Sequence, residues 1–295
     1  MSQPVSQPMS QPMSLRDKVC LITGPTQGIG LAATQAIAKL GPKLVLVVRD
    51  AKRGRELVEA LRIQGNPNVE LLVGDLSVQA DVRRVAAEFL SRHDRLHLLV
   101  NNAGAIFMQR QTSRDGLEMT FALNHLGYFL LTNLLRDVLV QSAPARIVNV
   151  ASRAHVRGTI AFDDLQAMRS YSGWSAYSQS KLANILFTRE LARRLQGTGV
   201  TCNCLHPGVV STGFGKNDSG WMRWVVRMAA PFLRSPEQGA ATTIFLATSP
   251  AVEGVTGTYF SDCKEREPSK EARDPKVAER LWQVSEQLTG LGKDS

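Results

Sequence analysis

The chain has 295 residues, of which 43% are hydrophobic and 21% are charged. These values are close to those of globular domains, and they exclude collagen-like, coiled-coil and wholly disordered chains. Lys and Arg number 35 against 26 for Asp and Glu, a net charge of +9 that suits a phosphorylated ligand, an anionic lipid surface or nucleic acid. We expect no nucleic-acid partner, because there is no zinc-finger spacing, no RNP-like aromatic motif and no long Lys/Arg block.

The N-terminal segment and the cysteines indicate a protein of a reducing compartment. Residues 1–14 repeat Ser-Gln-Pro without a charged side chain, and we expect a disordered polar tail rather than a signal peptide. No run of 18 or more apolar residues is present, which predicts no membrane span and a cytoplasmic protein. The four cysteines are too few for a disulfide scaffold, and we expect Cys202 and Cys204 to pack on one side of a strand.

From Lys18 onward, short apolar runs rich in β-branched residues alternate with helical patterns. Such strands, separated by helices, predict a parallel sheet that is covered on both faces. We therefore expect a single doubly wound α/β domain of the Rossmann type over 15–291, with about seven strands. In chain order, the expected strands are 18–23, 43–48, 69–73, 96–101, 146–152, 200–205 and 257–261, and the expected helices are 28–40, 51–64, 78–91, 115–140, 175–196, 237–248 and 275–289.

A glycine-rich turn joins the first expected strand to the first expected helix. Residues 23–30 are TGPTQGIG, and glycines there let the backbone approach a pyrophosphate, whose charge a helix N-terminus favours. An ordinary glycine-rich βα turn would have the same composition, and Pro25 removes one backbone N–H that a phosphate could use. The turn predicts a dinucleotide site formed by Gly24, Thr26, Gln27, Gly28, Ile29 and Gly30.

The residues after the second expected strand bear on which dinucleotide binds. A carboxylate at the strand end would hold the ribose 2′-hydroxyl of NAD, whereas an Arg would accept the 2′-phosphate of NADP. Val48 takes the acidic position here, and a basic cluster with Arg49 and Arg53 follows it. These residues favour NADP, with NAD as the alternative because Asp50 is adjacent. In a simpler interpretation, the cluster is a solvated helix start and Asp50 is its N-cap.

Two further turns carry residues that suit a nucleotide. Asp75, followed by Leu76, comes after the third strand and could accept a hydrogen bond from an adenine amino group, or cap the next helix. The fourth strand ends in small and amide residues, where a ribose could lie, although a plain turn is also compatible. These residues are Asn102, Ala103 and Gly104.

Residues 177–181, YSQSK, are the most specific local indication of catalytic chemistry in the chain. Positions four apart share a helix face, so we expect the Lys181 ammonium to lie near the Tyr177 phenol. A neighbouring cation favours the phenolate, which predicts a Tyr177 pKa below the ordinary value of about 10 and a role as general acid or base. A Tyr-x-x-x-Lys pair also occurs by chance on helix surfaces, so its neighbours decide its meaning.

Those neighbours also suit a catalytic site. Ser152 ends the fifth strand, where its hydroxyl could bond a substrate carbonyl, and Asn124 on the preceding helix could orient a water chain to Lys181. The sixth strand ends at Pro207 and Gly208, and a loop with Val210 and Thr212 follows. All these turns lie at the carboxyl ends of expected parallel strands, the edge at which open α/β sheets bind ligands.

Together these residues resemble the short-chain dehydrogenase/reductase family over about 15–291. Residues 124–132 (NHLGYFLLT), 180–188 (SKLANILFT) and 260–263 (FSDC) are similar to its retinol dehydrogenase branch. The resemblance implies an NADP(H)-dependent oxidoreductase that interconverts a lipophilic aldehyde or ketone and its alcohol, and it allows a homo-oligomer. It also implies the residue roles: Tyr177 exchanges the proton, Lys181 lowers the Tyr177 pKa and binds the nicotinamide ribose, Ser152 polarises the carbonyl, Asn124 holds the relay water, and Pro207, Gly208, Val210 and Thr212 join the cofactor site.

The segment 213–235 is expected to be the substrate lid. Within 221–234, Trp221, Trp224 and Met228 share one helical face while Arg223 and Arg227 lie elsewhere. A basic, Trp-bearing amphipathic helix can also lie on an anionic membrane surface, so peripheral membrane contact is the alternative.

Two other functions receive less support from the residues. We expect no metal site, because His93 and His97 have no third ligand and Arg95 lies between them. A dinucleotide-binding scaffold without catalysis would have a broken Tyr177/Lys181 pair or lack Ser152, and all three are present.

Overall fold

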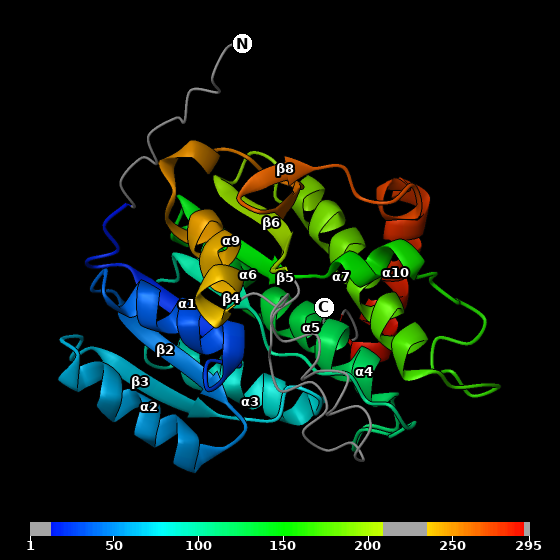
Figure 1. Ribbon diagram of the computed structural model, residues 1–295, viewed down its shortest axis with the longest axis horizontal. Helices are drawn as coiled ribbons and strands as arrows, with labels where there is room; N and C mark the ends of the chain where they lie inside the picture. The colour runs from blue at the N-terminus through cyan, green and yellow to red at the C-terminus, as the bar shows by residue number, and fades with distance from the viewer. Residues whose placement is uncertain (1–12, 209–234, 292–295) are drawn as a thin grey trace, which may run out of the picture.

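The computed structural model describes residues 13–208 and 235–291, and in them one eight-stranded sheet has the order β3-β2-β1-β4-β5-β6-β7-β8 (Figure 1). All neighbouring strands are parallel except β7 and β8, which are antiparallel. The strands are β1 (Val19–Thr23), β2 (Lys43–Val48), β3 (Val69–Val73), β4 (Leu98–Asn101), β5 (Ala145–Val150), β6 (Val200–His206), β7 (Tyr259–Ser261) and β8 (Lys264–Arg266). The longer helices are α1 (Gly28–Ala38), α2 (Ala51–Ile63), α3 (Gln79–Leu90), α5 (Gly127–Leu134), α6 (Arg136–Gln141), α7 (Gly173–Arg194), α9 (Pro236–Thr248) and α10 (Pro275–Thr289).

Helices cover both faces of the sheet, as the alternation of strands and helices predicts. Within β1, Cys20 and Ile22 pack on one face with residues of α1, α2 and α9, whereas Leu21 packs on the other with residues of α3, α5, α7 and α10. Figure 1 shows α1 and α9 side by side on one face, where Ala33 and Ala240 are in contact across them. The expected doubly wound Rossmann-type domain is therefore confirmed.

The sheet order places the expected functional turns together. The parallel register brings the carboxyl ends of β1, β2, β3, β4, β5 and β6 to one edge of the sheet. The order reverses between β1 and β4, which is the point at which open α/β sheets form a ligand crevice.

The eighth strand is absent from the sequence-based prediction, which had about seven strands. β8 has the sequence KER, and all three side chains are exposed, so it lacks the apolar pattern of a buried strand. A tight turn at Asp262 and Cys263, with φ of 56° and 57°, pairs it with β7.

The helix expected over 115–140 starts later and is interrupted. The Glu118 carboxylate caps the short helix α4 (Met119–Phe121) by accepting hydrogen bonds from the N–H groups of Thr120 and Phe121. A π-helical turn, η1 (Ala122–Leu126), follows, and Leu135 separates α5 from α6. Asp115 instead accepts a hydrogen bond from the N–H of Gln79 at the start of α3, at 2.8 Å.

The last helix has the expected ends. The Asp274 carboxylate accepts from the N–H groups of Lys276 and Val277, and Gly290 closes the helix in the left-handed conformation. Over 13–208 and 235–291, no helix has both the length and the apolar character to cross a bilayer. Two predicted cofactor residues, Val210 and Thr212, and the expected lid, apart from Ser235, lie outside the described residues.

Candidate active site

Hydrogen bonds join the glycine-rich turn after β1 to the turn after β4. The Asn102 side-chain amide donates to the carbonyl oxygens of Thr23 and Gly24, both at 2.9 Å. The Thr23 hydroxyl oxygen accepts from the N–H groups of Asn102 and Ala103, at 2.9 and 3.0 Å. A Cβ at Gly30 would lie 2.2 Å from the Gly24 carbonyl oxygen, so this position requires glycine. Asn102, expected beside a ribose, thus shapes the turn.

The start of α1 suits an anion. Its N-cap is Gln27, no side chain among the described residues caps it, and its first turn contains no acidic residue. The first N–H groups of a helix have no partner within the helix and carry partial positive charge. Thr26, Gln27, Gly28 and Ile29 surround these groups, and so the turn fits the pyrophosphate of a dinucleotide.

The basic cluster after β2 is partly a helix cap. Asp50 accepts from the N–H groups of Lys52 and Arg53, at 3.0 and 3.2 Å, so its interpretation as the N-cap is right. The Arg53 guanidinium lies 3.6 Å from the same carboxylate, and both side chains are more than half exposed. Arg49 is exposed at the carboxyl end of β2. Of the two arginines, Arg49 is therefore the one whose charge is less offset by Asp50.

Asp75 stabilises a turn rather than a helix start. Its Oδ1 atom accepts from the N–H of Ser77 at 3.0 Å and from the Ser77 hydroxyl at 2.7 Å. The N-cap of α3 is Val78, so the alternative that Asp75 caps this helix is wrong. Leu76 is buried, and its carbonyl would lie 2.6 Å from a Cβ at Gly127. The turn is thereby packed against α5.

Ser152 and Tyr177 meet at the carboxyl end of β5. Ser152 forms a hydrogen bond with the Tyr177 phenol, and its hydroxyl oxygen also accepts from the N–H of Ala154 at 3.2 Å. Tyr177 lies in the second turn of α7, and the exposed Trp174 packs edge-on against it with ring centroids 6.3 Å apart. A hydroxyl and a phenol are thus side by side at the edge where a substrate carbonyl would lie.

Lys181 follows Tyr177 by one turn of α7 and is only 3% exposed. Its ammonium donates to the Val150 carbonyl oxygen at 2.9 Å and lies 5.7 Å from the centroid of the Tyr177 ring. Burial lowers the pKa of Lys181 to about 7. The expected proximity of the two side chains is present, one helical turn apart on α7.

The Tyr177 pKa differs from the sequence-based expectation. Burial raises the pKa of Tyr177 above 10, and the hydrogen bond with Ser152 opposes this rise. The expected fall of the Tyr177 pKa below 10 is therefore contradicted. The same burial that raises the pKa of the phenol lowers that of Lys181, so at neutral pH much of the positive charge that would favour the phenolate is absent.

The Asn124 side chain forms hydrogen bonds with the turn that follows β4. Its Oδ1 atom accepts from the N–H of Ala105, and its amide donates to the Ala105 carbonyl and to the Ser180 hydroxyl, at 2.9, 2.9 and 3.0 Å. A Cβ at Gly104 would lie 3.1 Å from this Oδ1 atom and 3.5 Å from the Lys181 nitrogen. The π-turn that contains Asn124 therefore lies directly beside Lys181.

The family model described as short chain dehydrogenase matches residues 18–223. The chain belongs to this family. It is 44% identical to human retinol dehydrogenase 14 over 298 residues, which cover 95% of this chain and 88% of that protein. It is 42% identical to human retinol dehydrogenase 11, with 95% and 88% covered.

Solved structures of similar shape agree with this assignment. A crystal structure of a Mycobacterium paratuberculosis protein has a TM-score of 0.78 and 30% identity, and covers 96% of this chain and 97% of that one. The Pseudomonas aeruginosa RhlG/NADP active-site complex has a TM-score of 0.67 and 28% identity, with 84% and 95% covered.

Sequence reasoning missed two residues beside the site of this short-chain dehydrogenase. His155 is 2% exposed. Its Nδ1 atom lies 2.7 Å from the Ser152 carbonyl oxygen, and its Nε2 atom accepts from the N–H of Ser269 at 3.2 Å. Tyr128 is fully buried on α5, and its ring centroid lies 5.8 Å from the Lys181 nitrogen. Neither was expected as a site residue, because nothing in the local spacing of either one indicates a role.

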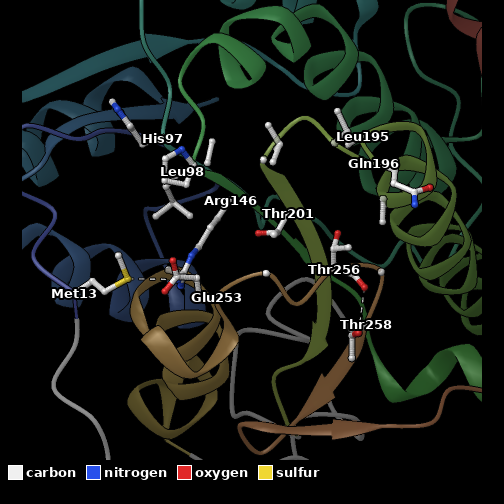
Figure 2. Close-up of a pocket in the computed structure, with 18 of the residues that line it drawn as sticks. Met13, His97, Leu98, Arg146, Leu195, Gln196, Thr201, Glu253, Thr256 and Thr258 are labelled. Carbon is white, nitrogen blue, oxygen red and sulfur yellow. Dashed lines mark hydrogen bonds between the residues drawn. The ribbon is translucent and has the colours of Figure 1, made fainter.

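A hollow of 820 Å³ lies far from this site, at the amino-terminal edge of the sheet (Figure 2). The Arg146 guanidinium projects into it and donates to the carbonyl oxygens of Leu246 and Ser249, at 3.1 and 2.9 Å. These bonds tie β5 to the end of α9, which is a structural role.

The two histidines considered for a metal have separate partners. His93 Nε2 lies 3.4 Å from a Glu70 carboxylate oxygen, and His97 Nδ1 accepts from the N–H of Val19 at 3.0 Å. Across the described ranges, no three His, Cys, Asp or Glu side chains are grouped closely enough to bind a metal ion.

Proposed function

We propose that the protein is an NADP(H)-dependent oxidoreductase that interconverts a lipophilic aldehyde or ketone and its alcohol, with Tyr177 as the general acid and base. One observation carries this proposal: Ser152, Tyr177 and Lys181 lie together at the carboxyl edge of the sheet. The start of α1 lies at the same edge, no described side chain caps it, and it suits a dinucleotide. The relatives named retinol dehydrogenase support the same chemistry.

In the direction of reduction, the Tyr177 hydroxyl donates its proton to the carbonyl oxygen of the substrate. Burial keeps this phenol protonated at neutral pH, so the proton is available. The Ser152 hydroxyl, already bonded to Tyr177, is placed to bond the same oxygen. The nicotinamide supplies the hydride when it is bound. Lys181, with a pKa of about 7, can hold the cofactor ribose and exchange protons near neutral pH.

NADP is favoured over NAD by the charge at the end of β2. Arg49 is exposed there, and the nearest carboxylate, Asp50, is occupied as the N-cap of α2. The 2′-phosphate of NADP would form a charge-assisted bond with a guanidinium at this position. The solved RhlG relative is named as a complex with NADP, in agreement with this proposal.

A lipophilic substrate is favoured by the apolar side chains around Tyr177. Trp174, about one helical turn before Tyr177, is 56% exposed, and Met108 is 38% exposed. Gly173, which precedes Trp174 in the chain, packs against Met108, because a Cβ at Gly173 would lie 2.8 Å from the Met108 Cα atom. Exposed large apolar groups beside a catalytic residue provide surface for the apolar part of a substrate.

The test is turnover of the purified protein with NADPH and with NADH on aldehydes and ketones of increasing chain length, including retinal. We expect kcat/KM to be at least about tenfold higher with NADPH, and higher for long apolar substrates than for short ones. Tight NADPH binding without turnover of any carbonyl would contradict the proposal and indicate a binding scaffold. Turnover with an NADH preference would refute only the choice of cofactor.

A further inference from the structure

His155 is a buried histidine close to Ser152 that the proposed mechanism does not use. It lies in the short helical turn η2 (Arg153–Arg157), which follows β5, and its side chain is 2% exposed. Burial of an imidazole is unfavourable unless its ring nitrogens have hydrogen-bond partners. Both ring nitrogens of His155 have one, and the two partners belong to segments that are far apart in the chain.

The two partners require one protonation state of the ring. The Nδ1 atom lies 2.7 Å from the Ser152 carbonyl oxygen, which can only accept, so Nδ1 carries a proton and donates it. The Nε2 atom lies 3.2 Å from the backbone nitrogen of Ser269, whose N–H can only donate, so Nε2 accepts. His155 is therefore neutral with its proton on Nδ1, and burial favours the neutral ring by lowering its pKa.

The bond from Nδ1 constrains the main chain of Ser152. The backbone of Ser152 is extended, with φ of −162° and ψ of 155°, and this residue is the N-cap of η2. Its carbonyl oxygen accepts from the backbone N–H of His155 at 3.2 Å as well as from Nδ1, and its hydroxyl oxygen accepts from the N–H of Ala154. Hydrogen bonds thus hold both polar ends of Ser152, whose hydroxyl also bonds the Tyr177 phenol.

The other partner of the ring belongs to a well-packed segment. Ser269 lies between β8 and α10, and nearby the Glu271 carboxylate accepts from the N–H of Ile160 at 3.0 Å. Tyr259 on β7 packs edge-on against the imidazole, with ring centroids 5.0 Å apart. The imidazole of His155 therefore connects the turn after β5 to the segment that leads into α10.

The same turn packs against the helix that carries Tyr177. A Cβ at Gly158 would lie 2.5 Å from the Ser178 carbonyl oxygen and 3.2 Å from the His155 carbonyl oxygen. The backbone after η2 therefore lies against α7 at the residue that follows Tyr177. Ser152 and Tyr177 are thus held by two elements that touch here, and the imidazole fixes the element that carries Ser152.

We propose that His155 is a positioning residue, whose Nδ1–H group holds the Ser152 carbonyl and thereby keeps the Ser152 hydroxyl aligned with Tyr177 and the substrate oxygen. This inference rests on the proposed function. His155 exchanges no proton in the reaction and acts through Ser152. A misaligned Ser152 hydroxyl would slow the chemical step, because that step depends on the geometry of the groups around the reacting oxygen. Cofactor binding does not depend on this alignment.

The test uses two amides that each replace one nitrogen of the ring. In His155→Asn the amide stands in for Nδ1 and can still donate to Ser152, whereas in His155→Gln it stands in for Nε2 and reaches toward Ser269. We expect His155→Gln to lower kcat by about tenfold with an unchanged KM for NADPH, and His155→Asn to keep kcat within about twofold of the wild-type value. His97→Gln is the control, because the Nδ1 atom of His97 bonds the Val19 N–H at the opposite edge of the sheet. It should leave kcat unchanged.

A second measurement uses the wild-type protein, which has five histidines. Its ¹H–¹⁵N correlation spectrum at pH 7 should show the His155 ring neutral, with the proton on Nδ1. A charged ring, or a proton on Nε2, would overturn the inference. So would a kcat in His155→Gln that is not lower than the kcat in His155→Asn. Both results would leave the proposed function intact in an active wild-type enzyme, whereas a wild-type protein that turns over no carbonyl would refute that function itself.

Discussion

At the scale of single residues, burial governs the protonation of the site. It raises the pKa of Tyr177 and lowers that of Lys181 to about 7, so each group is shifted toward its neutral form. A neutral phenol is the form that donates a proton to a carbonyl oxygen. At neutral pH Tyr177 is thus in the form that reduction needs, and alcohol oxidation requires it to lose its proton first.

The proposed preference for NADP depends on one exposed side chain, Arg49. We predict that Arg49→Leu raises the KM for NADPH by about tenfold, because the 2′-phosphate loses a charge-assisted bond, and that it leaves the KM for NADH unchanged. The control is Arg55→Leu, which removes an exposed charge from α2 and should change neither value. Equal losses with both cofactors in steady-state kinetics would show that Arg49 does not contact the 2′-phosphate.

At the scale of the elements, the contact between the β1 and β4 turns shapes the dinucleotide site. A Cβ at Gly30 would lie 2.4 Å from the Asn102 side-chain nitrogen as well as 2.2 Å from the Gly24 carbonyl oxygen. The start of α1 therefore packs against the hydrogen bonds that Asn102 donates between the two loops.

We predict that Gly30→Ala lowers the free energy of unfolding by about 3 kcal/mol and weakens NADPH binding by more than about tenfold. Gly116→Ala is the control, because Gly116 has a φ of +78° but nothing within 4 Å of the added Cβ. It should cost about 1–2 kcal/mol of stability from backbone strain alone and leave NADPH binding unchanged. Urea unfolding and fluorescence titration measure the two quantities, and normal NADPH binding in Gly30→Ala would contradict the account.

At the scale of the whole molecule, buried histidines link stability to pH. Burial lowers the pKa of His125 to about 4, and it lowers those of His97 and His155. His125 is fully buried, and its Nε2 atom lies 2.9 Å from the Ser285 hydroxyl on α10. Below its ordinary pKa of about 6.5, the unfolded chain binds protons that the folded protein does not, so stability falls as pH falls.

We predict that lowering the pH from 7 to 5 reduces the free energy of unfolding by about 2 kcal/mol through His125 alone. Lys181 contributes little to this change, because below about pH 6 it is protonated in both the folded and the unfolded state. Urea unfolding at a series of pH values measures the slope. The slope should be smaller in His125→Gln by this amount, and an identical slope in the variant would contradict the burial of a neutral His125.

Most of the fold follows from local pattern, whereas the fine structure of the site does not. Apolar runs such as KLVLVV in β2 predict buried parallel strands, and parallel strands place their following turns at one edge. The apolar pattern does not predict β8, because its charged residues form a strand only by pairing with β7. A helix repeat places Lys181 near Tyr177, but the sign of the Tyr177 pKa shift depends on burial, which tertiary packing sets.

Tyr177 has the central role in the proposed reaction, and NADPH-dependent reduction of a long-chain aldehyde by Tyr177→Phe tests this role most directly. The variant keeps the ring and loses only the hydroxyl. We predict that kcat/KM falls by about 10³, while the dissociation constant for NADPH and the thermal midpoint are unchanged. A variant that retains more than a tenth of the wild-type activity would show that another group moves the proton.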